Sequence, residues 1–142
     1  MRVLQPSDWA RPRGYANGIS ARGTHVFVGG QIGWNAQQRF EREDFAGQAR
    51  QALENVVAVL AAGGARPEHV VRMTWYLLDR NEYVANLAPL GQAYRALFGR
   101  HYPVMSAVEV RALVEPQARL EIEATAVIPE ATARRSRILR VR

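Results

Sequence analysis

Apolar residues recur with the period of an α-helix in one long segment of the chain. They stand at Phe45, Ala49, Ala52, Leu53, Val56, Val57 and Leu60. This spacing is typical of a helix that buries one side, because residues one turn apart lie on the same face. Asp44 can cap the start of this helix. Gly63-Gly64 supply its end, and Pro67 prevents it from continuing.

A second helical pattern runs from Tyr83 to Phe98. Its apolar positions are Tyr83, Leu87, Leu90, Tyr94, Leu97 and Phe98. Pro89 interrupts this pattern, because proline lacks the N–H group that a helix interior needs and is tolerated in a first turn. We therefore expect the main helix to begin near Ala88 and to end at Gly99.

Four segments are predicted as strands by their β-branched and aromatic residues. They are Thr24–Val28, Val70–Leu78, Val104–Leu113 and Arg119–Ile128. The first should stop at the turn-prone pair Gly29-Gly30. In the last, apolar residues alternate with charged or polar ones, which indicates a strand with one buried face. Residues 33–43 are polar and are expected to form a loop or hairpin.

The order of these elements predicts an α+β fold, a mixed sheet with two helices packed on one face. Val71, Met73, Trp75 and Leu77 would share one side of their strand. Met73 and Trp75, together with the closing strands, offer more apolar surface than one helix layer should cover. We therefore hypothesise that subunits bury the other face of the sheet against each other.

Length and charge divide the chain into three parts. Its 142 residues suffice for a single domain with a core. Residues 1–14 are expected to form an irregular arm, 15–129 the domain, and 130–142 an arginine-rich tail. The tail holds five arginines, which account for most of the chain's net charge of +6. The rest of the chain is therefore nearly neutral. A basic tail can bind phosphate, but a solvated terminus is favoured, and nucleic acid is not the expected partner.

Other chemistry is excluded by what the sequence lacks. With no cysteine there are no disulfides or thiolate nucleophiles. His25, His69 and His101 fit no metal-ligand spacing, so neither a metal nor a cofactor is expected. No apolar run approaches the roughly 20 residues of a membrane helix, and the start has no signal-peptide core. A cytoplasmic location, away from membranes, is the expectation.

Several short motifs occur in a particular order along the chain. They are Tyr15–Gly18, Phe27–Ile32, Gln48–Asn55, Val70–Asp79, Tyr102–Val110 and Leu120–Ala124. In order and spacing, over about residues 15–129, the chain resembles the RidA/YjgF family of enamine/imine deaminases, also labelled endoribonuclease L-PSP. The resemblance implies a chorismate-mutase-like α+β fold and a homotrimer, with a small-molecule ligand bound in clefts at the subunit interfaces.

The resemblance implies roles for five residues. Glu121 matches a carboxylate thought to position or activate the water that attacks the imine carbon. Tyr15 matches a cleft tyrosine, and Gly30, followed by Gln31, matches a glycine whose backbone lies beside the ligand. Ala107 stands where backbone groups contact the ligand and cysteine is common. On spacing alone, Glu121 is better explained as the solvent face of its strand; the resemblance favours the catalytic role.

Met105 departs from the family pattern. An arginine usually stands there and clamps the substrate carboxylate with two parallel hydrogen bonds, which methionine cannot make. The implied ligand is therefore less anionic and more apolar, or its anion is held by another arginine. Arg13, Arg72 and Arg111 are the alternatives. The family's cleft asparagine cannot be placed, because the segment after Asp79 is longer than usual; Asn86 is only a guess.

Three functions remain open. The first is hydrolytic deamination of a small enamine or imine metabolite, releasing ammonia, with a substrate range altered by the absence of the arginine. The second is a non-catalytic protein that holds a small metabolite on the same trimeric scaffold. An endoribonuclease is the least favoured, since the body is neutral and lacks a histidine pair or metal site for phosphodiester cleavage.

Overall fold

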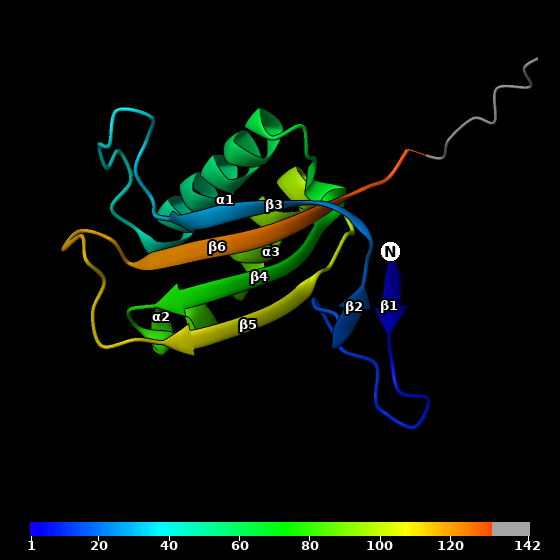
Figure 1. Ribbon diagram of the computed structural model, residues 1–142. Helices are drawn as coiled ribbons and strands as arrows, with labels where there is room; N and C mark the ends of the chain where they lie inside the picture. Colours follow the sequence, from blue (N-terminus) through cyan, green and yellow to red (C-terminus); the bar gives the residue numbers. More distant parts are fainter. Residues whose placement is uncertain (132–142) are drawn as a thin grey trace, which may run out of the picture.

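The computed structural model describes residues 1–131 and divides them into ten elements (Figure 1). The strands are β1 (Arg2–Leu4), β2 (Gly18–Ser20), β3 (Gly23–Gln31), β4 (Val70–Leu77), β5 (Val104–Glu109) and β6 (Leu120–Pro129). The helices are α1 (Phe45–Ala62), α2 (Arg80–Ala85) and α3 (Leu87–Phe98), with a short 3₁₀ turn at Pro67–His69. This is the predicted α+β architecture.

Four strands form the main sheet, in the order β3-β6-β4-β5. The pairs β3–β6 and β6–β4 are antiparallel, whereas β4 and β5 are parallel, so the sheet is mixed. The helical segments that link β4 to β5 supply the crossover that a parallel pair requires. β5 is an edge strand, and its free side is available to other parts of the protein.

The long helices α1 and α3 pack together on one face of the sheet (Figure 1). α1 begins and ends where local signals predict. The Asp44 carboxylate accepts a hydrogen bond from the N–H of Gly47 at 2.9 Å, and Gly63 follows as the C-cap. Its apolar stripe, including Leu53 and Val56, is fully buried against the sheet. This layer fixes which face of the sheet is closed and which is open.

The apolar surplus inferred for β4 has a different explanation from the one expected. Met73 and Trp75 point into the helix layer, where Met73 is fully buried. They therefore provide no reason for a subunit contact on the other face. Val70 rather than Val71 joins this buried row, because the pairing of β4 with β6 shifts between Val70 and Arg72. A bulge of this kind moves the side chains before it to the other face.

The second helical pattern is divided in two, as Pro89 suggested. α2 ends at Ala85, and α3 begins at Leu87, one residue before the predicted start. Pro89 lies in the first turn of α3, where its missing N–H leaves no hydrogen bond unmade. α3 ends at Phe98, and Gly99 follows it with φ of 61°, a left-handed conformation that glycine adopts without strain.

Three boundaries differ from the prediction. β3 continues through Gly29-Gly30 to Gln31, because the partner strand β6 holds it across an irregularity after Val28. β5 ends at Glu109 rather than at Leu113, where its pairing with β4 stops. The N-terminal arm is not wholly irregular, since β1 pairs with β2. The predicted arginine-rich tail, 130–142, lies almost entirely outside the described residues.

Candidate functional site

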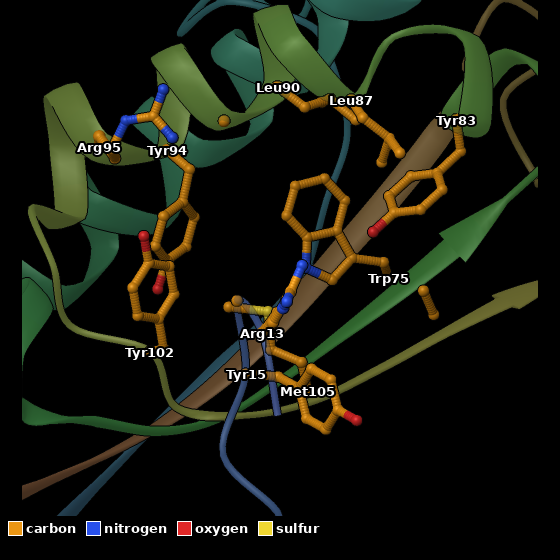
Figure 2. A pocket seen from close by; sticks show the side chains of 13 residues that line it. Arg13, Tyr15, Trp75, Tyr83, Leu87, Leu90, Tyr94, Arg95, Tyr102 and Met105 are labelled. Atoms are coloured by element: carbon orange, nitrogen blue, oxygen red, sulfur yellow. The ribbon is translucent and has the colours of Figure 1, made fainter. Parts of the chain in front are cut away.

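A pocket of about 380 Å³ opens between α3 and the edge of the sheet (Figure 2). Met105 and Ala107 face it from β5, and Trp75 faces it from β4. Their alignment follows from the strand register, in which Trp75 lies opposite Ala107. Leu87 and Leu90 complete the wall from α3. The volume is within the range of sites that bind small molecules.

The segment before β2 brings Arg13 and Tyr15 to this pocket. Ala16 forms a bridge with Val104, and its N–H donates to the carbonyl of Pro103 at 3.0 Å, so the segment runs along the edge of β5. Gly14 between them has φ of 76°, a left-handed conformation at a bend of the chain. Arg13 and Tyr15, on either side of Gly14, both line the pocket, whereas Ala16 is buried.

The three alternative arginines occupy different places. Arg13 lines the pocket beside Met105. Arg72 lines a second hollow, which lies on the other face of the sheet. Arg111 is exposed in the bend after β5. Arg95 of α3, which the sequence did not single out, is a second cation at the pocket.

Trp75 carries an unpaired donor in the wall of the pocket. Only 6% of this residue is exposed, yet its indole nitrogen Nε1 is the single buried side-chain polar atom within residues 1–131 that has no hydrogen-bond partner. The ring meets Tyr83 edge-on, with centroids 6.3 Å apart. Burying an N–H without an acceptor is unfavourable by about 1–3 kcal/mol, and such groups are rare in folded proteins.

An aromatic stack closes the end of the pocket beside Arg95. Tyr94 stacks on Phe98 and on Tyr102, with ring centroids 4.9 and 5.5 Å away. The hydroxyl of Tyr94 donates a hydrogen bond to the carbonyl of His101. Burial raises the pKa of Tyr94 far above its ordinary value, with a smaller contribution from Tyr102. Tyr94 is therefore a neutral, fixed part of the wall.

Glu121 lies on the other face of the sheet. It pairs with Tyr76 across β4 and β6, so it points away from the helices. A Cβ atom on Gly30 would lie 2.7 Å from the carboxyl carbon of Glu121, which means that the carboxylate rests directly on the Gly30 backbone. Gln31 follows in β3, and its amide donates to the carbonyl of Gly29 at 3.2 Å.

Glu121 and its neighbour Glu123 differ in their hydrogen bonding. The hydroxyl of Tyr76 donates to Glu123 at 2.6 Å. This hydrogen bond, more than burial, raises the pKa of Tyr76 above its ordinary value. Within residues 1–131, the Glu121 side chain takes part in no hydrogen bond or ion pair that would occupy its carboxylate. Of the two, Glu121 is the one left free to bind a water or a ligand.

A buried glutamine of α1 positions the start of β6. Gln48 is 2% exposed. Its side-chain amide donates to the carbonyl of Gln117 at 3.0 Å, and its side-chain oxygen accepts from the N–H of Arg119 at 2.8 Å. Both bonds join α1 to the chain just before β6, and Arg119 lies two residues before Glu121. Gln48 thus holds the start of the strand that carries Glu121.

The residues expected to form one site are divided between two faces of the sheet. Tyr15, Met105 and Ala107 share the pocket, whereas Glu121 lies against Gly30 on the opposite face. Asn86, the guess for the cleft asparagine, instead donates to the carbonyl of Glu82 at 2.7 Å at the junction of the helices and does not line the pocket. No group of three or more His, Asp or Glu in residues 1–131 could hold a metal ion.

Several pocket residues were interpreted from the sequence only as core. Trp75 belongs to an apolar strand face, and Leu87, Leu90 and Tyr94 follow a helical period, which is normally a packing pattern. The sequence held no signal that separates them from core residues. Only the strand order, with β5 at the edge of the sheet, shows that one end of the α3 stripe faces the pocket.

The chain is similar in sequence to proteins that are already named. A family model described as Endoribonuclease L-PSP matches residues 9–128. A 2-iminobutanoate/2-iminopropanoate deaminase from Salmonella typhimurium is 35% identical over 116 residues, which cover 80% of this chain and 86% of that protein. A RutC family protein from Pyrococcus horikoshii is 35% identical over 126 residues, covering 87% and 95% of the two chains.

Two solved structures extend the comparison. YyfB from Yersinia pestis, a member of the conserved Rid protein family, is 31% identical, with a TM-score of 0.79 and coverage of 89% of this chain and 98% of that one. TdcF from E. coli, solved with bound serine, is also 31% identical, with a TM-score of 0.63 and coverage of 90% and 99%.

The fold described above superposes on that of the Rid family protein YyfB with a TM-score of 0.79. The family model spans most of the chain, and the relatives are more than 30% identical over most of their length. The chain therefore belongs to the RidA/YjgF family, whose model is described as Endoribonuclease L-PSP. No helix in residues 1–131 is both long and apolar enough to span a membrane.

Proposed function

We propose that this protein is a RidA-like deaminase that hydrolyses the C=N bond of a small enamine or imine metabolite. The observation that carries the proposal is the carboxylate of Glu121, which lies against the bare backbone of Gly30 with no side-chain partner among the described residues. A carboxylate held in this way can accept a proton from water beside a bound ligand. Names of relatives support the reaction class, since the Salmonella protein is a named imine deaminase.

In the proposed reaction, Glu121 first accepts a proton from water and then passes that proton to the substrate nitrogen. A water oxygen forms a bond to the imine carbon while one water proton passes to the Glu121 carboxylate. The π electrons of the C=N bond pass to the nitrogen, which takes this proton from Glu121 and a second proton from solvent. The C–N bond then breaks, ammonia leaves with the bonding electrons, and the hydroxyl of the intermediate releases its proton to solvent as it becomes the carbonyl of the product. An enamine substrate must first gain a proton on carbon to give the imine.

We also propose that the working site is assembled from two protomers of a homotrimer. Glu121 and the pocket that contains Met105 lie on opposite faces of one sheet. A single ligand can touch both only if the open face of one protomer meets the edge of another. Phe27, on the same open face, is 73% exposed. Phe27 thus gives the open face an apolar side chain that a second subunit could cover.

The substrate range should differ from that of the named relative. The Salmonella protein is named for 2-iminobutanoate and 2-iminopropanoate, which are small carboxylates. TdcF was solved with serine, another small carboxylate. In this chain position 105 carries methionine, whose side chain has no charge. A clamp on a small carboxylate from that position is therefore lost. The pocket around Met105, of about 380 Å³, has a largely apolar lining.

Ammonia release from freshly generated imines tests the proposal. Amino acids are oxidised to imines in the assay, and ammonia is measured with and without the protein, for small and for bulky apolar side chains. Glu121→Gln should lose the acceleration, because an amide cannot accept the proton. Glu123→Gln is the matched control and should retain most of it. Equal activity of the wild type and Glu121→Gln would contradict the assignment of Glu121.

A binding protein without turnover is the second candidate. It is favoured by Met105, since the loss of a carboxylate clamp removes orientation that catalysis needs. The same assay separates the two functions. If no imine in the panel is hydrolysed faster than in buffer, whereas a ligand still binds to wild type and Glu121→Gln equally, the binding function is correct and deamination is excluded.

A further inference from the structure

No residue among 1–131 supplies a hydrogen-bond acceptor for the buried indole N–H of Trp75. Its Nε1–H group has no partner, although the residue is more than nine-tenths buried and lines the pocket. Tryptophan can only donate at this atom. A complementary ligand therefore carries a hydrogen-bond acceptor at the end of the pocket toward which Nε1 points.

Arg13 adds a positive charge to the same pocket. In the view of Figure 2, the indole nitrogen of Trp75 points to the side at which Arg13 is drawn, whereas Arg95 lies farther along, beside Tyr94. None of the ion pairs found within residues 1–131 involves Arg13. A guanidinium without a carboxylate partner is suited to an anionic acceptor, which it can hold with two parallel hydrogen bonds.

The rest of the pocket is apolar and partly aromatic. Leu87 and Leu90 face the ring of Trp75, and Tyr83 meets that ring edge-on. Met105 adds a flexible thioether, which makes favourable contacts with aromatic rings. A ligand with a short aliphatic chain would leave most of this volume unfilled, and unfilled apolar surface contributes nothing to binding. An aromatic ring fits the lining better.

From these contacts we infer that the pocket binds an aryl-substituted carboxylic acid, with the carboxylate held by Arg13 and the Trp75 N–H and the ring placed among Leu87, Leu90 and Met105. Arg13 thus takes over, from a different segment, the task for which Met105 is unsuited. This inference rests on the proposed function in one respect: the substrate is then the 2-imino derivative of such an acid, with its C=N carbon next to the carboxylate.

Binding of stable probes tests the inference without any need for turnover. The probes are 3-phenylpropanoate, its neutral amide 3-phenylpropanamide, and propanoate, measured by calorimetry on the full-length protein. We expect 3-phenylpropanoate to bind at least about tenfold more tightly than the amide, because only the acid can pair with a guanidinium. Propanoate should bind more weakly than either, because it leaves the apolar volume empty.

Variants identify the residues responsible. Arg13→Gln should weaken binding of the acid by about tenfold or more and weaken binding of the amide much less, because only the acid forms a charge-assisted pair with the guanidinium. Arg11→Gln, two residues away and not at the pocket, is the matched control and should change neither. Trp75→Phe, which keeps a ring but removes the N–H, should weaken both probes, since acid and amide each offer an acceptor oxygen.

The inference is overturned if acid and amide bind equally, if Arg13→Gln and Arg11→Gln have the same effect, or if the acid does not bind at all. Its failure is distinct from failure of the proposed function. Tight binding of 3-phenylpropanoate without hydrolysis of any imine would support the inference and exclude the deaminase. Hydrolysis of small imino acids without binding of the aryl acid would do the reverse.

Discussion

Glu121 and Met105 lie on opposite faces of the same sheet. Glu121 pairs with Tyr76 of β4, and Met105 pairs with Met73 of the same strand. Positions 73 and 76 are three residues apart on a regular strand, so their side chains point to opposite sides. The proposed site uses both residues, and for this reason we propose that a second protomer completes it.

Gly30→Ala should reduce deaminase activity without unfolding the protein. A methyl group at Gly30 would collide with the Glu121 carboxylate, which can swing away because it is the end of a flexible side chain. The carboxylate then leaves the position from which it could act on water. We expect the rate of ammonia release to fall by about tenfold or more, since a small misplacement of a catalytic group is costly.

Gly29→Ala is the control for this prediction. A Cβ at Gly29 would meet no atom within 4 Å, so the substitution changes the strand without moving Glu121. Circular dichroism of both variants checks that the fold is retained. If the two alanine variants lose activity to the same extent, the effect comes from the strand rather than from displacement of Glu121.

Met105→Arg should shift the substrate range toward small imino acids. The new guanidinium would stand in the pocket and offer a small carboxylate the two hydrogen bonds that methionine cannot make. It would also occupy apolar volume and repel Arg13. We expect kcat/KM for 2-iminopropanoate to rise by about tenfold or more, with a fall for aromatic imino acids. If the ratio of kcat/KM for 2-iminopropanoate to kcat/KM for aromatic imino acids does not change, position 105 does not control specificity.

Gln48→Leu should destabilise the fold. The leucine would leave the carbonyl of Gln117 and the N–H of Arg119 without partners in a partly buried region. We expect the free energy of unfolding, measured with urea, to fall by about 2–4 kcal/mol. Gln51→Leu, on the same helix and less buried, is the comparison. A loss no greater in Gln48→Leu than in Gln51→Leu would contradict the role given to Gln48.

Alkaline pH should weaken the fold through Tyr94. Its folded-state pKa lies above the ordinary value of 10.0 because the ring is buried. The neutral phenol therefore stabilises the fold fully below that value, and this contribution is lost as the pH rises toward the folded-state pKa. In Tyr94→Phe, the free energy of unfolding should fall less steeply between about pH 10 and 11.5. Equal slopes in the variant and the wild type would refute this.

The sequence predicted elements well where local chemistry determines their ends. Asp44 and Gly63 delimit α1 by capping, which depends only on neighbouring residues. The ends of β3 and β5 were wrong because they depend on where a partner strand stops. Gly29-Gly30 looked like a turn, yet pairing with β6 carries the strand through it.

The candidate site was predicted in its parts and not in its arrangement. Alternation within a strand correctly placed Met105 and Ala107 on one side. Alternation could not show whether Met105 and Glu121 lie on the same face of the sheet, because that depends on the register at which β5 and β6 each pair with β4. The same register determines that Trp75 faces the pocket. Arg13 was one of three equal alternatives, and its place in the pocket depends on tertiary contacts such as the bridge of Ala16 to Val104.

Mixed oligomers test most directly whether the site is shared between protomers. Glu121→Gln should inactivate the half of the site that carries the carboxylate, and Ala107→Phe should fill the half that forms the pocket. Each variant alone is expected to release no ammonia above background. Co-expressed with different tags and purified through both, the two should regain part of the wild-type activity, because some interfaces join two intact halves. Mixed oligomers that remain as inactive as either parent would contradict a site made by two protomers.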